Sequence, residues 1–187
     1  LVNAIEAEKD LHIRAAFRLL LESGARLSEV LHARWEDLSF EGGTWRLPSP
    51  KSGHPQVIPL GERTLKMLRR LPRIGPYVIP SRNPRSRPGD KKAAARLQRP
   101  RGDLKKPWER IRDAAELEDV RIHDIRRSFG LEVAKSAGLH VASKLLRHSS
   151  IKVTEQVYAP LGIEDLRAAV ERRADVIPFP EHRKNAG

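Results

Sequence analysis

His123-Asp124-Ile125-Arg126-Arg127-Ser128-Phe129 is the most informative stretch of this 187-residue sequence. It opens a predicted helix over residues 123–137, which Gly138 ends. His123 and Arg126 are three positions apart in that helix, so they share one face. Taken alone, the two residues also fit an ordinary exposed helix surface. Their meaning therefore depends on the rest of the chain.

Three further segments place polar side chains where the chain is predicted to turn. Arg26 follows Ser23-Gly24-Ala25 between two predicted helices, and Lys51 begins the turn Lys51-Ser52-Gly53-His54. His148 follows Leu145-Leu146-Arg147, and Tyr158 comes ten residues later. Each has a plain structural alternative: an ion pair with Glu22 or Glu29 for Arg26, a turn lysine for Lys51, a helix-end histidine for His148 and a packing residue for Tyr158.

The charge balance favours a polyanionic partner. Lys and Arg number 36 against 24 Asp and Glu, which gives a formal net charge of +12. Nucleic acid is the first candidate, and a generally basic surface is the alternative. Because aromatic residues make up only 5% of the chain, a reader of single strands that stacks bases is disfavoured relative to a duplex binder.

Much of the excess charge lies in residues 81–106, which we expect to form a loop that is partly helical around Ala93 to Leu97. A solvated loop without a partner is the alternative for any single residue in it. The expected contacts with DNA phosphates are Arg82, Arg85, Arg87, Lys91, Lys92 and Arg96, together with Arg127 outside the segment.

Several classes of site are absent from the sequence. The chain has no cysteine, no glycine-rich phosphate loop and no cluster of carboxylates of the kind that holds two metal ions. His123 and His148 do not have the spacing of a zinc site. We therefore expect no metal and no cofactor. No stretch of 18 apolar residues is present, so we expect no membrane partner and a cytoplasmic location.

Periodicity predicts a mainly helical α+β domain with a small antiparallel sheet of three strands. One helix is expected over residues 4–22, with Leu11, Ala15 and Leu19 on its apolar stripe and Gly24 as its stop. The strands are expected around Leu38 to Phe40, Trp45 to Leu47 and Gln56 to Leu60, with a short extended piece at 77–79. The other expected helices are 28–33, 62–71, 107–117, 123–137, 140–147, 151–158 and 163–174.

The order Arg, Lys, His-x-x-Arg, His, Tyr over about 130 residues resembles the catalytic domain of the tyrosine recombinases, the phage-integrase family. The resemblance runs from about residue 10 to residue 174. It implies a six-residue site made of Arg26, Lys51, His123, Arg126, His148 and Tyr158. The chain departs from the family pattern at Arg147 and Gly130, where the family usually has Gly and Ala. Arg147 places a large cation just before His148, where the family backbone often packs closely.

The resemblance also implies a reaction, the cleavage and rejoining of duplex DNA through a covalent 3′-phosphotyrosyl intermediate on Tyr158. Arg26 and Arg126 would hold the phosphate oxygens and His148 would donate a hydrogen bond to one of them. His123 would take or relay the phenol proton, and Lys51 would protonate the departing 5′ oxygen. Glu29 and Asp124 are expected to orient arginines or cap helices rather than to take part in the chemistry.

By the same resemblance, residues 1–174 form the catalytic domain and 175–187 a tail, with a DNA-clamping domain of the family missing before Leu1. The expected task is site-specific recombination, as in integration or excision of a phage or mobile element. The expected assembly is a homotetramer on DNA in which residues 160–180 dock onto a neighbouring copy, with a monomer as the alternative without DNA. A type IB topoisomerase-like enzyme and an inactive DNA-binding accessory protein are the alternative functions.

Overall fold

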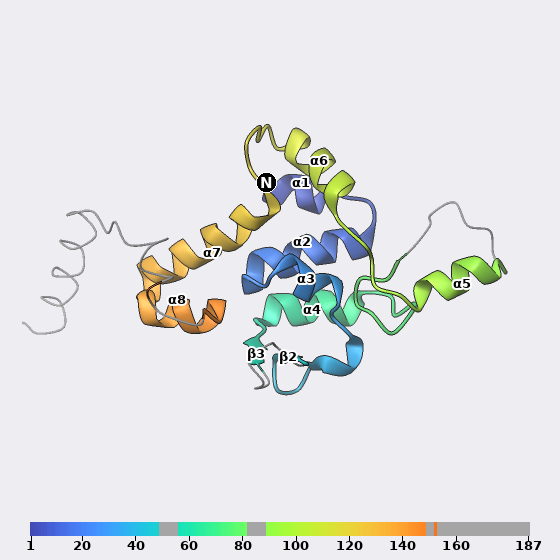
Figure 1. Cartoon of the computed structure of the whole chain (residues 1–187), viewed down its shortest axis with the longest axis horizontal. Helices are drawn as coiled ribbons and strands as arrows, with labels where there is room; N and C mark the ends of the chain where they lie inside the picture. The colour runs from blue at the N-terminus through green and yellow to red at the C-terminus, as the bar shows by residue number, and fades with distance from the viewer. Residues whose placement is uncertain (49–55, 82–88, 149–151, 153–187) are drawn as a thin grey trace, which may run out of the picture.

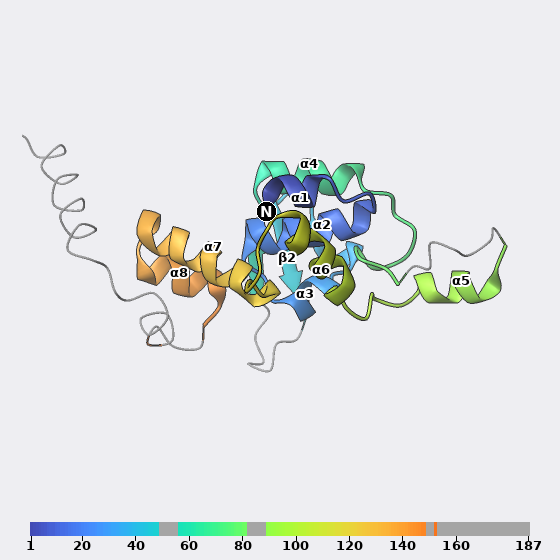
Figure 2. The same ribbon diagram turned by 90° about the horizontal axis from the view of Figure 1, so that it is seen from above.

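The structure is a computed structural model that describes residues 1–48, 56–81, 89–148 and 152. A small sheet lies at one edge of a helical body, helices α7 and α8 extend from one end of the body, and α5 projects from the other (Figures 1 and 2). Within the described residues the predicted mainly helical α+β class is confirmed. In the described ranges the helices are α1 (Val2–Glu6), α2 (Leu11–Ser23), α3 (Leu27–Leu31), α4 (Glu62–Arg70), α5 (Lys91–Leu97), α6 (Lys105–Ala114), α7 (Ile122–Ala137) and α8 (Leu139–Leu146), and a 3-10 turn lies at Trp35–Asp37.

The predicted three-stranded antiparallel sheet is present. Its strands are β1 (Leu38–Ser39), β2 (Thr44–Leu47) and β3 (Gln56–Pro59), in the order β1-β2-β3. Trp45 on the central strand pairs with Leu38 on one side and with Ile58 on the other. Both Trp45 and Ile58 are 1% exposed, so the central strand anchors the sheet in the core. The turn between β1 and β2 contains Gly43, whose φ of +60° is the left-handed conformation that glycine adopts without penalty.

The prediction of a single helix over residues 4–22 is wrong, because α1 ends at Glu6 and α2 begins only at Leu11. Asp10 causes the break: its carboxylate accepts from the backbone N–H of His12 at 3.0 Å and of Ile13 at 3.3 Å and so begins a new helix. Leu11, predicted to lie on the buried stripe, is 46% exposed as the first residue of α2. Gly24 ends α2 as predicted, with φ +59°.

Most of the other expected elements are found with shifted ends. The short helix predicted at 28–33 is Leu27–Leu31, and the one predicted at 107–117 is Lys105–Ala114. The extended piece at 77–79 is confirmed by an isolated antiparallel bridge between Arg34 and Tyr77. The helices predicted at 151–158 and 163–174 lie outside the described residues, apart from Lys152, which is helical.

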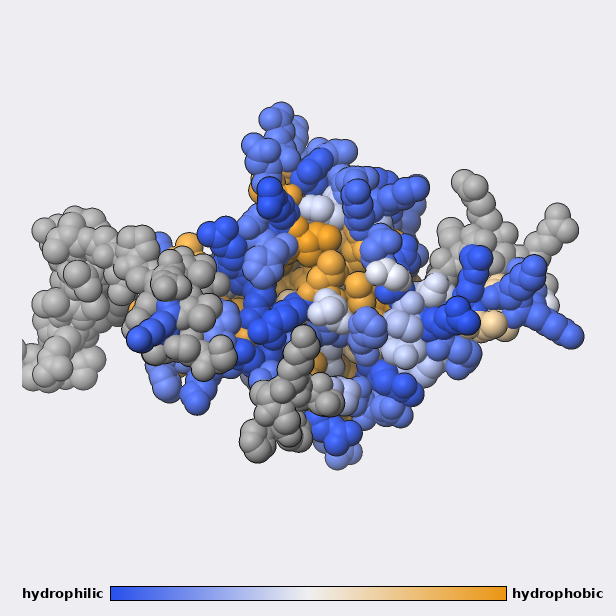
Figure 3. Space-filling view, viewed as in Figure 1, coloured by the Kyte–Doolittle hydropathy of each residue, from blue (hydrophilic) through white to orange (hydrophobic). Residues whose placement is uncertain are grey.

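Two separate hydrophobic clusters support this arrangement. The large one combines α1–α4, the sheet, α6 and, through Ile125, the start of α7, and it includes the fully buried Phe17, Trp45 and Leu68. The small one joins α7 to α8 through Ala134, Ala142 and Leu146. In the view of Figure 3, apolar residues reach the surface in the centre of the body, and hydrophilic residues cover most of the rest. No helix in the described part of the chain has both the length and the apolar character needed to span a membrane.

Candidate DNA-cleavage site

The turn between α2 and α3 positions Arg26. Gly24 is in the left-handed conformation, and a Cβ atom built on it would lie 2.3 Å from Cδ1 of Phe129 on α7. This approach is open only to glycine, and it seats α7 directly on the turn. Arg26 then caps α3: its backbone N–H donates to Oε2 of Glu29 at 2.7 Å, and its Nη1 donates to Oε1 at 2.8 Å. The ion pair with Glu29 that formed the structural alternative is therefore present, and it leaves the Arg26 side chain 45% exposed.

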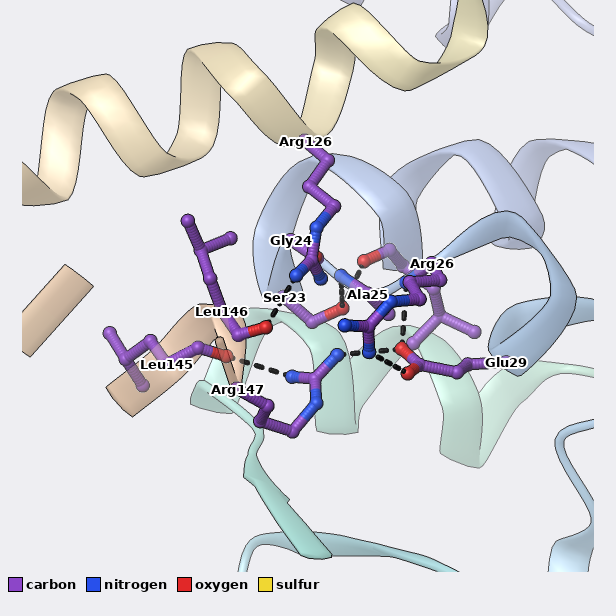
Figure 4. Close-up of polar contacts among 10 residues, drawn as sticks. Ser23, Gly24, Ala25, Arg26, Glu29, Arg126, Leu145, Leu146 and Arg147 are labelled. Carbon is purple, nitrogen blue, oxygen red and sulfur yellow. Dashed lines mark hydrogen bonds and ion pairs between the residues drawn. The ribbon is translucent and has the colours of Figure 1, made fainter. Parts of the chain in front are cut away.

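Arg126 connects this turn to the end of α8. The residue is 5% exposed, and its Nη1 donates to the carbonyl oxygen of Gly24 at 2.6 Å. Its Nη2 donates to the carbonyl oxygen of Leu146. Gly24 is two residues before Arg26, and Leu146 is two residues before His148. One buried guanidinium thus brings three predicted site positions together, and Figure 4 shows Arg126 between Gly24 and Leu146.

His148 lies two residues after the last residue of α8, and Arg147 forms the turn between them. Arg147 has φ +56° and ψ +45°, a left-handed conformation that is uncommon for a residue with a side chain. Its Nη2 donates to Oε2 of Glu29 at 2.6 Å and its Nη1 to the carbonyl oxygen of Leu145 at 2.8 Å. Glu29 therefore receives two guanidiniums from different elements, Arg26 from α3 and Arg147 from the end of α8 (Figure 4).

The charges of this cluster shift its titrating groups. Burial, followed by the positive charges of Arg126, Arg26 and Arg147, lowers the pKa of His148 from its usual 6.5, so its imidazole is neutral at pH 7. Burial raises the pKa of Glu29, but the charge of Arg147 and the hydrogen bonds from Arg26 outweigh it, so the net pKa lies below 4.5. The carboxylate is therefore ionised at pH 7.

His123 lies one turn before Arg126, in the first turn of α7, and it is exposed whereas Arg126 is buried. The two residues come from one helix, as predicted, but they differ in how far they reach into the protein. Asp124 has the role expected of it. Its Oδ2 accepts from the backbone N–H of Arg121 at 2.9 Å and caps α7.

The predicted phosphate contacts divide into two groups. Lys91, Lys92 and Arg96 are exposed on α5, a helix with no buried residue that projects from the body (Figure 2). Arg127 is 60% exposed and forms a 3.5 Å ion pair with Asp124. Arg82, Arg85 and Arg87 lie outside the described residues, as do the predicted catalytic residues Lys51 and Tyr158.

Sequence reasoning missed two features of the site, the sharing of Glu29 between two arginines and the inward course of Arg147. A signal for the second was present, since Arg147 departs from the glycine of the family pattern, but it indicated a disturbance rather than an ion pair. In the described part of the chain, no group of three or more His, Asp or Glu side chains is placed to hold a metal ion. What the cluster offers is guanidinium groups beside a neutral imidazole, a set that binds and polarises a phosphate.

Comparison with known proteins identifies the family. The model of the phage integrase family matches residues 1–162. The tyrosine recombinase XerA of Pyrococcus furiosus is 26% identical over 179 residues, covering 92% of this chain and 58% of that protein. The shufflon-specific DNA recombinase of Escherichia coli is also 26% identical, over 94% of this chain and 44% of its own length. The chain thus spans about half the length of these relatives.

A solved structure gives the same fold. The catalytic domain of bacteriophage HP1 integrase superimposes with a TM-score of 0.62 at 20% identity, covering 96% of this chain and 92% of that one. The Tn1549 transposon integrase in complex with a circular intermediate DNA superimposes with a TM-score of 0.66 at 19% identity, covering 91% and 62%. The predicted tyrosine recombinase catalytic-domain fold is confirmed. With its model matched over residues 1–162, the chain belongs to the phage integrase family.

Proposed function

We propose that this protein is a site-specific recombinase that cuts and rejoins duplex DNA through a covalent bond to Tyr158. The observation that carries the proposal is the contact of Arg126 with the carbonyls of Gly24 and Leu146, which gathers Arg26, Arg126 and His148 from three separate elements. Membership of the phage integrase family and the named activities of the relatives support it. The DNA complex of the Tn1549 integrase supports duplex DNA as the partner.

In this proposal the phenolate oxygen of Tyr158 attacks the scissile phosphorus, a 3′-phosphotyrosyl bond forms, and the bond from phosphorus to the 5′ oxygen breaks. The phosphotyrosyl ester retains the energy of the broken linkage, so rejoining needs no ATP. Arg26 and Arg126 stabilise the charge that builds on the non-bridging oxygens. Loss of one such donor costs about 3–4 kcal/mol of barrier, by analogy with oxyanion donors.

The remaining predicted residues move protons or hold the phosphate. Because the usual pKa of a phenol is about 10, Tyr158 needs a proton acceptor, and exposed His123 is assigned that role. Lys51 protonates the leaving 5′ oxygen. His148 is neutral at pH 7 because burial and the nearby arginines lower its pKa, so it can donate one hydrogen bond without carrying charge.

The proposal extends to the assembly. Residues 1–174 form the catalytic domain, and duplex phosphates are contacted by the basic side chains of α5 and by Arg127. The proposed assembly is a homotetramer on DNA in which residues 160–180 dock onto the next copy. The proposed location is the cytoplasm. Because each neutralised phosphate releases counterions, duplex binding should weaken steeply as salt rises. A flat response to salt would count against the α5 contacts.

The decisive experiment traps the covalent intermediate. A duplex that carries a nick beside the cleavage point loses the short strand after cleavage, so the adduct cannot be rejoined. We expect a protein–DNA adduct that resists denaturation, with no added metal or ATP. Tyr158→Phe should abolish it, whereas Tyr77→Phe, at the only other tyrosine, should leave it intact. An intact protein that binds the duplex without forming an adduct would instead be an accessory protein.

A further inference from the structure

Arg147 occupies a backbone conformation that its residue type does not favour. In the described part of the chain only Glu116 and Arg147 have positive φ without being glycine, at +54° and +56°. The left-handed conformation costs a residue with a Cβ about 1–2 kcal/mol relative to glycine. Glu116 is exposed and makes a simple turn after α6, whereas the Arg147 side chain is 5% exposed. The contacts of the Arg147 side chain must therefore offset two costs, the strain of its backbone conformation and the loss of hydration of its buried guanidinium.

The contacts of that side chain explain what holds it. Oε2 of Glu29 accepts from Nη2 of Arg147 at 2.6 Å and from the backbone N–H of Arg26 at 2.7 Å, while Oε1 accepts from Nη1 of Arg26 at 2.8 Å. The side chains are 5% exposed for Arg147, 15% for Glu29 and 45% for Arg26. The carboxylate thus lies between a buried guanidinium and one that faces solvent.

The charge count gives this arrangement a consequence. A carboxylate paired with Arg26 alone would cancel most of the positive charge that Arg26 could offer to a phosphate. With Arg147 on the other side, two guanidiniums share one carboxylate, and the cluster keeps a net charge of +1 in addition to Arg126. The forked guanidinium also holds the carbonyl of Leu145, which a lysine could not do at the same time with the same planar geometry.

We propose that Arg147 is a positioning residue for DNA cleavage: through Glu29 it fixes the direction of Arg26, and it offsets the carboxylate charge so that Arg26 acts on the phosphate. It also ties the end of α8, and with it His148, to the start of α3. The inference rests on the proposed function, since it concerns the phosphate that Arg26 meets there.

Arg147→Gly tests the proposal with little disturbance of the backbone, because glycine accepts φ +56°. We expect single-turnover adduct formation on the nicked duplex to slow about tenfold, which corresponds to ~1.4 kcal/mol. The dissociation constant for the duplex should change less than about threefold, because the other phosphate contacts are retained. Glu116→Gly is the matched control: it relieves the same strain at an exposed turn and should cleave at the wild-type rate. Equal rates for Arg147→Gly and wild type would overturn the proposal.

A double-mutant cycle keeps the test decisive where Arg147→Gly reduces stability. Arg147→Lys retains the cation but not the fork, so its rate should lie between those of wild type and Arg147→Gly. In a Glu29→Gln background the Lys substitution should have little further effect, because its partner is already gone. Additive effects of the two substitutions would overturn the coupling. If wild type itself forms no adduct with the duplex it binds, the proposed function fails and this inference fails with it; an active wild type with an unaffected Arg147→Gly refutes this inference alone.

Discussion

The two halves of the candidate site are stabilised by hydrophobic clusters of different size. The turn that carries Arg26 follows α2, whose buried Phe17, Leu19 and Leu20 belong to the large hydrophobic cluster. The end of α8, which carries His148, belongs to a cluster with three buried residues, Ala134, Ala142 and Leu146. Burial of apolar surface stabilises roughly in proportion to its area, so the first half is firmly held and the second has much less to hold it.

Arginine contacts add to the stability of the half with the smaller hydrophobic cluster. Two arginines of the α7–α8 hairpin reach the other half: Arg126 contacts the carbonyl of Gly24 in the α2–α3 turn, and Arg147 contacts the carboxylate of Glu29 in α3. Arg126, which is assigned to phosphate chemistry, therefore also connects the end of α8 to the α2–α3 turn, and Arg147 adds a second connection through Glu29. We therefore expect the position of His148 to depend on these polar contacts as well as on the packing of α7, whose Ile125 belongs to the large cluster.

The largest expected effect on stability comes from removing the buried guanidinium of Arg126. Arg126→Ala leaves the carbonyls of Gly24 and Leu146 without a charged donor, and we expect a loss of about 3–5 kcal/mol in the free energy of unfolding. Urea denaturation measures it. Arg127→Ala, at the adjacent 60% exposed position, should cost less than about 0.5 kcal/mol. Similar costs for the two variants would show that packing, not Arg126, holds the α7–α8 hairpin.

The next effect tests the contact of α7 with the turn. Gly24→Ala adds a Cβ that would lie 2.3 Å from Cδ1 of Phe129 at φ +59°, and we expect a loss of about 2–3 kcal/mol. Gly102→Ala, where nothing lies within 4 Å, is the neutral control in the same thermal unfolding experiment. Adding Phe129→Leu to Gly24→Ala should recover part of the loss by removing the ring. No recovery would assign the whole cost to backbone strain.

These residues also show how far the sequence could predict the site. Gly24 was recognisable as a helix stop, and the hairpin around Gly42-Gly43 as a turn, because both depend on local conformation. The break before α2 was missed although Asp10 carried the local signal for it. The pairing of Arg147 with Glu29 joins residues 118 positions apart. No local pattern encodes it, because it exists only once α8 has docked beside α3.

A smaller effect concerns the charge of Glu29. Burial raises the pKa of its carboxyl, but Arg147 and Arg26 outweigh burial and hold it below the usual 4.5. A carboxyl with a lowered folded-state pKa contributes stability above pH 4.5, and that contribution is lost as the pH falls toward the folded-state pKa. Glu29→Gln should therefore cost about 1–2 kcal/mol at pH 7. The difference from wild type, followed by urea denaturation at stepwise lower pH, should shrink below pH 4.5; a constant difference would contradict the ionic role.

The smallest expected effect concerns the pKa of His148, in the half of the site at the end of α8. Burial first, and then Arg126, Arg26 and Arg147, lower the pKa of His148 below 6.5. Protonation then favours the unfolded chain, so His148 reduces stability as the pH falls below 6.5, and the penalty levels off below its folded-state pKa.

The titration midpoint of the His148 ring, followed by NMR, should lie below 6.5 in the wild type. Arg26→Ala should move the pKa of His148 upward, because it removes a nearby positive charge without touching the carbonyls that Arg126 holds. Arg127→Ala, which removes an exposed cation that is not among the causes of the shift, serves as the control. If Arg26→Ala leaves the midpoint unchanged, the end of α8 does not lie close enough to the α2–α3 turn for the two halves to act on one phosphate.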